Sequence, residues 1–467
     1  MNILLIVPDK KGFSTEGLQS LGIGMIAAVL KRAGHDVTIR DLTVQPADDE
    51  NFAGFLYALE PEMVGFTVVT ATARRVYDEL IPLVRHHSPT CLLLLGGAHP
   101  TAMPDEALQY ADIVVRGEGE ETVVELCSNL ERLDTVNGIS YRTTDGTVHN
   151  PPREFIQNLD ELPFPARELF PPLSSYGGLP SVRGKIVGNL STSRGCYGRC
   201  KFCYNAIFGR KSRYRSAENI LDEWELLVKN HGAEVITISD DHFTSNPKRV
   251  ELICSELVRR GLHNTPWTCS NGIRVETATV EMLSRMKSAG CQAVAFGIES
   301  GSQQVLDLMD KRITLDKIRN AVTNARKAGI PTITGFFMLG TPWDTLESMH
   351  ETITFSKSLP LDYAQFAIAT PYPGTEMHDM VKDSLTGVPY SLYGAHEGTI
   401  YFRHATLSDQ QILDSFKDAY RSFYLRPEMV VRHLCRILLS PSTLGSYLGG
   451  LKTFIIGRQV GVAERFY

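Results

Sequence analysis

Short apolar runs alternate with helix-length segments along the first third of the chain. Asn2–Val7 is apolar at consecutive positions, as in a strand that is buried on both faces. Further strand-like runs are Asp36–Arg40, Val64–Val69, Cys91–Leu95 and Ile113–Val115. Helical segments are Leu21–Ala33, Arg74–His86 and Glu121–Leu130. This α/β alternation predicts a doubly wound, mostly parallel sheet that binds its ligand at the carboxyl ends of the strands.

The alternation returns with a longer spacing between Lys185 and Ile368. The strands that we expect there are Ile186–Ser191, Glu234–Ser239, Trp267–Ser270, Gln292–Gly297, Thr332–Leu339 and Asp362–Ile368. The helices that we expect between them include Ala217–Asn230, Lys248–Arg260, Val280–Ala289, Leu315–Ala328 and Leu346–Ser358. Six strand–helix units predict a partial parallel (β/α)6 barrel, in which the chemistry lies on the loops after the strands.

A segment of turn-forming residues separates these two patterns. Thr143–Pro180 contains Asp145-Gly146, Pro151-Pro152 and Gly177-Gly178, which is typical of a connector. We therefore expect a first domain over residues 1–142, a linker over 143–184, the barrel over 185–375 and a mainly helical region over 376–467.

Composition and charge exclude several classes of protein. The net charge of the 467 residues is −6, so nothing global indicates a nucleic-acid partner. The 9 cysteines are odd in number and thinly spread, unlike a secreted disulfide framework. No apolar stretch reaches the roughly 18 residues that span a bilayer, and the first residues do not resemble a signal peptide. We therefore expect the protein in the reducing cytoplasm.

Three of the cysteines lie together directly after the first predicted barrel strand. Cys196, Cys200 and Cys203 have the spacing C-x3-C-x2-C. Thiolates suit iron–sulfur clusters, and a four-iron cluster held by only three of them leaves one iron open for a further ligand. The alternatives are a zinc site completed by a distant ligand, or three unrelated thiols. Zinc sites usually show paired C-x2-C halves, and the chain has no second pair.

With Phe202 before the last cysteine, and the run Gly297-Ile-Glu-Ser-Gly-Ser302 after the fourth barrel strand, the chain resembles a known family. It resembles the cobalamin-dependent radical S-adenosylmethionine (SAM) enzymes, which include class B methyltransferases and an anaerobic oxidative cyclase. The resemblance spans both domains. It implies that the three cysteines bind a 4Fe-4S cluster, whose open iron takes the amino and carboxylate groups of SAM.

The resemblance also implies where SAM is held. The residues concerned follow the second to fourth barrel strands and are Asp240, Asp241, Ser270, Arg274, Glu299 and Ser300. A carboxylate of the aspartate pair would accept hydrogen bonds from the SAM amino group, although aspartate at this position is also a common helix N-cap. Arg274 would pair with the SAM carboxylate, unless it is a surface arginine. Glu299 and Ser300 would bond the ribose hydroxyls.

In the first domain the resemblance implies a cobalamin site at the ends of the third, fourth and fifth strands. The residues expected to approach the corrin ring and its nucleotide tail are Val68, Val69, Thr70, Gly96, Gly97, Gly117, Glu118 and Gly119. The chain lacks the Asp-x-His-x-x-Gly motif that ligates cobalt from below, so we expect no histidine ligand there. His99 is interpreted as a loop residue. The alternative is a degenerate domain that binds no cofactor.

The implied activity is reductive cleavage of SAM to a 5′-deoxyadenosyl radical, hydrogen abstraction from an unactivated carbon, and methyl transfer via methylcobalamin. The alternatives are an oxidative cyclase or ring-rearranging enzyme that does not methylate, and a non-catalytic cobalamin or iron–sulfur sensor. The expected partners are a small-molecule or lipid substrate and a reducing donor such as flavodoxin or ferredoxin.

The end of the chain has a different charge balance from the rest. Residues 421–467 contain seven Lys or Arg and two Glu, so their net charge is +5 while that of the whole chain is −6. Apolar residues lie between these charges. The pattern fits either capping helices with a solvated face or peripheral contact with an anionic membrane.

Overall fold

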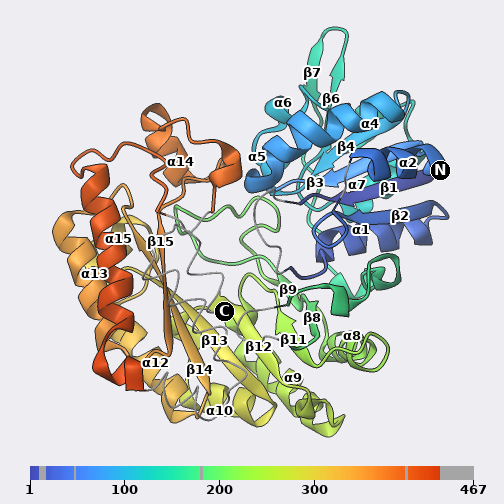
Figure 1. The fold of residues 1–467 in the computed structure, drawn as a ribbon. Helices are drawn as coiled ribbons and strands as arrows, with labels where there is room; N and C mark the ends of the chain where they lie inside the picture. Colours follow the sequence, from blue (N-terminus) through green and yellow to red (C-terminus); the bar gives the residue numbers. More distant parts are fainter. Residues whose placement is uncertain (10–16, 47–48, 179–181, 183, 395–397, 432–467) are drawn as a thin grey trace.

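Two mainly parallel sheets organise residues 1–9, 17–46, 49–178, 182, 184–394 and 398–431, which the computed structural model describes (Figure 1). The first sheet has seven strands in the order β2-β1-β3-β4-β5-β6-β7. They are β1 (Asn2–Val7), β2 (Asp36–Asp41), β3 (Met63–Thr67), β4 (Leu92–Gly96), β5 (Ile113–Val115), β6 (Ile139–Thr143) and β7 (Gly146–His149). The first five pair in parallel, and β5, β6 and β7 pair antiparallel.

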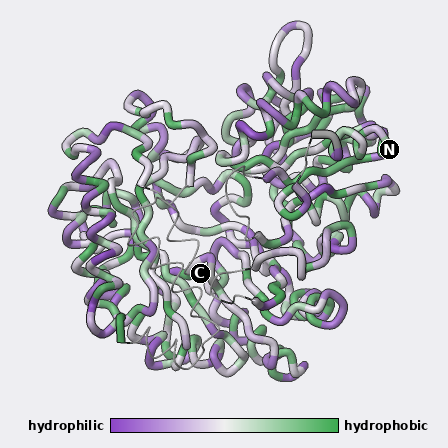
Figure 2. Tube along the Cα trace, viewed as in Figure 1, coloured by the Kyte–Doolittle hydropathy of each residue, from purple (hydrophilic) through white to green (hydrophobic). Residues whose placement is uncertain are grey.

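Helices cover both faces of this sheet, so the predicted doubly wound fold is confirmed. The helices are α1 (Leu21–Arg32), α2 (Asp49–Leu59), α3 (Ala73–Arg75), α4 (Ile81–His87), α5 (Ala98–Ala102), α6 (Pro104–Ala107) and α7 (Glu120–Ser128). Ile23 of α1 and Leu126 of α7 belong to one hydrophobic core, whereas Phe52 of α2 and Val84 of α4 belong to another. The apolar strands lie between these layers, and more hydrophilic residues lie outside (Figure 2).

The hairpin β6–β7 corrects our expectation for the start of the linker segment. Thr143 pairs with Gly146, so Thr144 and Asp145 form a two-residue turn. The polar Asp-Gly dipeptide that we interpreted as connector sequence is also a strong hairpin signal. The sheet therefore continues past residue 142, where we expected the first domain to end.

The second sheet has six strands in the order β15-β14-β13-β12-β11-β8, and each neighbouring pair is parallel. The strands are β8 (Val187–Leu190), β11 (Val235–Ile238), β12 (Trp267–Ile273), β13 (Cys291–Glu299), β14 (Thr332–Leu339) and β15 (Tyr363–Ile368). The helices are α8 (Ala217–Lys229), α9 (Pro247–Arg259), α10 (Val280–Ser288), α11 (Gln303–Leu308), α12 (Leu315–Lys327) and α13 (Leu346–Ser358). They lie outside the curved sheet (Figure 1), which confirms the partial barrel.

Local sequence explains why these helices begin where they do. The residue before each of five barrel helices accepts a hydrogen bond from a backbone N–H in the first turn, and these caps are Ser216, Asn246, Thr279, Thr314 and Thr345. Such caps satisfy N–H groups that have no partner within the helix. The helix starts were therefore readable from the sequence.

A C-terminal helix covers the open edge of the barrel. It is α15 (Asp409–Tyr424), and it follows the short α14 (Glu376–Val381). The Tyr420 hydroxyl accepts from Phe366 N–H and donates to its carbonyl, and Tyr424 does the same at Ala364. These tyrosines satisfy backbone groups that an edge strand would otherwise leave unpaired.

The described helical region ends at Val431, so most of the basic tail, residues 432–467, lies outside the described residues. No described helix has the length and apolar character that are needed to cross a membrane.

Candidate functional site

The three clustered cysteines lie in a closed loop. Strand β9 (Ser193–Arg194) pairs antiparallel with β10 (Arg213–Tyr214), so residues 195–212 form the loop between two short stems. Gly195 has φ +85°, and a Cβ there would lie 2.6 Å from the Lys211 carbonyl oxygen. Only glycine fits such a position. It lets the second half of the loop fold back onto Cys196, whose N–H donates to the Gly209 carbonyl at 3.3 Å.

Gly198 lies close to two of the thiols. A Cβ on it would lie 3.4 Å from Cys196 Sγ and 3.8 Å from Cys200 Sγ. Its N–H points to Cys196 Sγ at 3.4 Å. Burial raises the pKa of the Cys196 thiol, which the Gly198 N–H and the Arg274 guanidinium act to lower. Ligation of a metal would therefore displace a proton from this thiol at neutral pH.

All three cysteines are free thiols, and Cys203 lies within electrostatic range of the other two. Among the described residues, no three His, Cys, Asp or Glu side chains converge as the ligands of one metal ion would. In a four-iron cluster each thiolate binds its own iron, so the sulfurs are farther apart than around one ion. Three neighbouring thiols on one loop fit that donor set.

The two aspartates after β11 have different partners. The buried Asp240 accepts from Thr192 N–H at 2.5 Å and from the hydroxyls of Thr192 and Ser193. It thus ties the end of β11 to the start of the cysteine loop. Asp241 is exposed and accepts from Gly195 N–H at 3.0 Å. Its charge also acts on Cys196 and Cys203, so Asp241 is the carboxylate of this pair that has room for a ligand near the thiols.

Arg274 reaches the cysteine loop from the end of β12. Its Nη2 donates to Glu276 Oε1 at 2.6 Å and to the Lys311 carbonyl at 2.8 Å, while its Nη1 lies 4.0 Å from Cys200 Sγ. The Glu276 carboxylate outweighs burial and raises the pKa of the guanidinium, which stays charged. Arg274 is therefore not a surface arginine, because only 11% of its side chain is exposed.

Lys311 is a buried cation that the sequence interpretation missed. Its ammonium lies 2.8 Å from Glu299 Oε1 and 5.5 Å from the centre of the Phe202 ring. The residues on either side of it, Asp310 and Arg312, have positive φ without being glycine. No glycine or proline marks this turn, so no local pattern could have placed Lys311 beside the cysteines.

The other residues expected at SAM differ in availability. Glu299 has φ +68° and pairs with Lys311. Ser300 is buried, and its hydroxyl lies 3.1 Å from the Thr352 hydroxyl and accepts from Ser302 N–H at 3.1 Å. Ser270 lies within β12, but its side chain is outside the described part of the chain.

A cavity of about 370 Å³ lies between the first sheet and the start of the barrel. Its residues from strand ends and loops of the first unit include Thr67, Gly96, Gly97, Gly117, Glu118, Gly119 and Glu120. Ser191, Arg194, Ile207, Phe208 and Ser239 line it from the barrel unit. The wall is mostly apolar and includes Leu5, Phe66 and Leu94. An apolar pocket edged by glycine backbone fits the nucleotide tail of cobalamin.

The loop after β3 does not reach this cavity as expected. Thr67 lines the cavity, whereas Val68, Val69 and Thr70 are absent from its wall. Val68 is fully buried, Val69 is 51% exposed, and the Thr70 hydroxyl lies 3.3 Å from His99 Nδ1. Since β3 ends at Thr67, two residues before the predicted end, the loop turns away earlier. His99 is buried between Tyr77 and Tyr390 and does not line the cavity.

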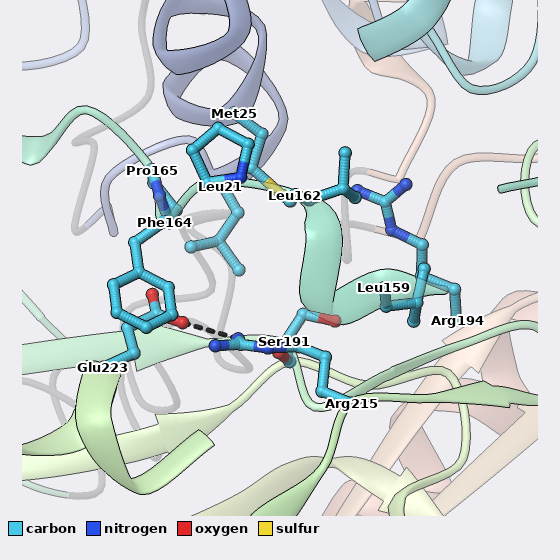
Figure 3. A pocket seen from close by; sticks show the side chains of 11 residues that line it. Leu21, Met25, Leu159, Leu162, Phe164, Pro165, Ser191, Arg194, Arg215 and Glu223 are labelled. Atoms are coloured by element: carbon cyan, nitrogen blue, oxygen red, sulfur yellow. Dashed lines mark hydrogen bonds and ion pairs between the residues drawn. The ribbon is translucent and has the colours of Figure 1, made fainter. Parts of the chain in front are cut away.

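A smaller pocket lies next to the cavity and shares Leu21, Met25, Ser191 and Arg194 with it (Figure 3). Linker residues from Leu159 to Pro165 close its other side. The Arg215–Glu223 ion pair, at 2.5 Å, crosses its base. The linker therefore packs where the two units meet.

Comparison with known protein families gives two matches along the chain. The radical SAM superfamily matches residues 190–356, and the B12 binding domain matches residues 16–127. The first match contains the cysteine loop and barrel strands β11 to β14, and the second contains strands β2 to β5 of the first sheet.

Individual proteins match over most of the chain. An uncharacterised methyltransferase of Pyrococcus horikoshii is 34% identical over 450 residues, which are 93% of this chain and 95% of the relative. An anaerobic magnesium-protoporphyrin IX monomethyl ester cyclase of Cereibacter sphaeroides is 27% identical over 421 residues, covering 86% of this chain and 66% of the relative.

One solved structure shows the same fold. It is that of OxsB, a cobalamin-dependent S-adenosylmethionine radical enzyme, with aqua-cobalamin and S-adenosylmethionine bound. The TM-score is 0.74 at 18% identity, and the match covers 90% of this chain and 65% of OxsB.

Proposed function

This chain belongs to the cobalamin-dependent radical SAM methyltransferase family, and on that premise we propose that it methylates an unactivated carbon of a small-molecule substrate. The observation that carries the proposal is the cavity of about 370 Å³, because its wall comes from the first unit and from the barrel unit together. A group bound there would lie beside the loop that holds the cysteines. A reaction that uses both cofactors requires that their binding sites lie next to each other.

When bound, the 4Fe-4S cluster supplies the electron that cleaves SAM, and cobalamin carries the methyl group. Cys196, Cys200 and Cys203 would hold the cluster. The charged side chains beside these cysteines complement the ammonium and carboxylate groups of an amino acid such as the methionine part of SAM. Asp241 would accept hydrogen bonds from an ammonium group, and Arg274 would pair with a carboxylate.

The chain's own contacts fix these groups in advance. Asp240 anchors the start of the cysteine loop, and Glu276 holds the Arg274 guanidinium beside Cys200. Preorganised groups need less rearrangement when the ligand binds. Glu299 would keep Lys311 charged inside the barrel, where an unpaired ammonium would be costly. The electron itself must come from an outside reductant, and a small redox protein such as flavodoxin or ferredoxin fits that need.

The test is anaerobic turnover with isotopically labelled SAM. The full chain is reconstituted with iron, sulfide and cobalamin, reduced, and given SAM with a deuterated methyl group. Mass spectrometry then follows 5′-deoxyadenosine and deuterium in the cobalamin fraction. We expect both from the wild type and no 5′-deoxyadenosine from Cys200→Ala. Cys254→Ala is the matched control, because Cys254 is a buried thiol on α9 outside the loop.

The outcomes separate the candidate reactions. If 5′-deoxyadenosine forms while no deuterium reaches cobalamin, methyl transfer is contradicted and a cyclase-like reaction is favoured. If neither signal appears in protein with an intact cluster, the assignment of SAM cleavage is wrong. A sensor without catalytic activity would also give neither signal, and retained cleavage of SAM excludes it.

A further inference from the structure

Both ends of the cysteine loop are bonded to one carboxylate of the first unit. Arg194 on β9 and Arg213 on β10 are directly paired residues, so they are the stems of the loop. Arg194 Nη1 donates to Glu118 Oε1 at 2.7 Å, and Arg213 Nη1 donates to Glu118 Oε2 at 2.8 Å. Glu118 follows β5 in the first sheet. A single side chain thus joins the first unit to both stems of the loop that holds Cys196, Cys200 and Cys203.

Arg194 also binds a second carboxylate. Its Nη2 donates to Glu120, the first residue of α7, so its planar guanidinium joins two carboxylates at once. Each of these four side chains is less than a tenth exposed. Two arginines face each other across the stems, and like charges in that position repel. Glu118 and Glu120 neutralise them, so the geometry of the stems depends on both glutamates.

The same side chains form part of the cavity wall. Glu118, Glu120 and Arg194 all line the cavity between the two units. A ligand that fills this cavity removes the water that still reaches these ion pairs from the cavity side, and charge pairs strengthen when water is excluded. Occupancy of the cavity therefore acts on the residue that lies two positions before Cys196.

We propose that Arg194 couples the two cofactor sites, so that cobalamin in the cavity and the cluster on the cysteine loop each strengthen the binding of the other. The coupling rests on the proposed function, since it needs both cofactors. Linkage makes it reciprocal, because the factor by which one ligand raises the affinity for the second is the same in both directions. Arg194 is a positioning residue, since it acts through the stems of the loop and not through contact with the reacting atoms.

The experiment measures the affinity for hydroxocobalamin in the full chain, with and without the reconstituted cluster. Binding is followed by equilibrium dialysis and the visible absorption of the cobalamin. We expect the wild type to bind at least about fivefold more tightly when the cluster is present, the lower end of typical coupling factors. In Arg194→Lys the two affinities should converge, because lysine keeps the charge but lacks the fork that reaches both glutamates.

Two further variants make the result specific. Arg326→Lys is the matched control, because Arg326 donates to Asp362 at 2.7 Å on the far part of the barrel. It should keep the wild-type ratio of affinities. Glu120→Gln provides a second route if Arg194→Lys does not fold, because it removes one of the two partners and leaves Glu118 in place. It should reduce the ratio as well.

Equal affinities in the wild type, with and without the cluster, would overturn the coupling while leaving the proposed function intact. An unchanged ratio in both Arg194→Lys and Glu120→Gln would overturn the role of Arg194. If the wild type does not bind hydroxocobalamin in either state, the proposed function itself fails and the coupling fails with it.

Discussion

The two sheets offer different surfaces at the same kind of edge. At the carboxyl ends of the first sheet the cavity is edged by Gly96, Gly97, Gly117 and Gly119, and the rest of its wall is mostly apolar side chains. At the corresponding edge of the barrel, Asp241, Arg274, Glu299 and Lys311 bring four charged side chains close to the cysteines. Glycine residues leave space for a large group, whereas charged side chains of both signs suit the ammonium and carboxylate of a small zwitterion.

The difference follows from the two ligands that the family implies. A bulky cofactor with a long tail is held by the area of apolar contact that it buries. An amino acid is recognised by its ammonium and carboxylate, which need charged partners at fixed positions. Between the two surfaces lie four ion-paired side chains, which connect the first unit to the barrel unit. They are Glu118, Glu120, Arg194 and Arg213. Substitutions in each of the three places should therefore have different consequences.

The largest effect is expected where the two surfaces meet. Glu118→Gln leaves Arg194 and Arg213 facing each other across the stems with only Glu120 to neutralise them. Breaking a buried ion pair by removing one partner costs about 3–5 kcal/mol, so we expect the free energy of unfolding to fall by that amount. Denaturant unfolding of the cluster-free chain measures it. Glu225→Gln is the control, because Glu225 forms a surface pair with Lys229 at 3.6 Å, and such pairs contribute about 0–1 kcal/mol. Equal losses in the two variants would contradict this account.

Much of the fold was predictable because burial leaves a strong local signal. Ile113–Val115 and Thr332–Leu339 were predicted with the bounds that the structure has. A parallel strand covered on both faces is apolar throughout, and a Ser, Thr or Asn cap in the sequence marks the residue before a helix begins. The β6–β7 hairpin was missed because half of it is exposed and its turn resembles a linker. Local patterns thus identify elements that are buried better than those at the edge of a sheet.

The candidate site was only partly predictable, since its contacts join distant parts of the chain. The spacing of the three cysteines is a local feature, so the sequence alone predicts that they act together. The pairing of Arg194 with Glu118 joins residues 76 positions apart, and no periodicity reports it. For the same reason Glu118 was expected to face cobalamin, and its ion pairs with two arginines were not foreseen. Asp240 and Asp241 are adjacent in sequence, yet only the structure shows that Asp240 is occupied by Thr192 and Ser193.

The second effect concerns the charged surface of the barrel. Arg274→Gln removes a guanidinium that lies beside Cys200 and that we assign to the SAM carboxylate. Hydrogen bonds to charged groups contribute about 1.5–3 kcal/mol, so we expect the affinity for SAM to fall by about 10- to 150-fold. Isothermal titration of the cluster-loaded chain measures it. Arg259→Gln, which removes a surface arginine on α9 paired with Glu256, should leave SAM binding unchanged. If Arg274→Gln binds SAM with unaltered affinity, the assignment of Arg274 to the SAM carboxylate is wrong, and Lys311 is the next candidate cation.

The smallest effect should come from the glycine-edged surface, and it should be confined to cobalamin. A Cβ on Gly96 would meet nothing closer than the Val115 carbonyl oxygen at 3.7 Å, so the chain has room for a Cβ there. In Gly96→Val the added methyl groups would occupy part of the cavity. Overfilling a packed site costs about 1–3 kcal/mol, so we expect hydroxocobalamin to bind about tenfold more weakly.

Equilibrium dialysis measures this affinity. The electron paramagnetic resonance spectrum of the reduced cluster with SAM, recorded without cobalamin so that coupling between the cofactors does not act, should stay as in the wild type. Gly54→Val on α2 is the control, because Gly54 does not line the cavity and a Cβ there meets nothing within 4 Å. A changed cluster spectrum in Gly96→Val would show that the two surfaces are not separable by shape and charge. Gly96 has no side chain that contacts Glu118 or the cysteine loop. The contrast between the two sheets therefore requires that Gly96→Val weaken cobalamin binding and leave the cluster spectrum unchanged.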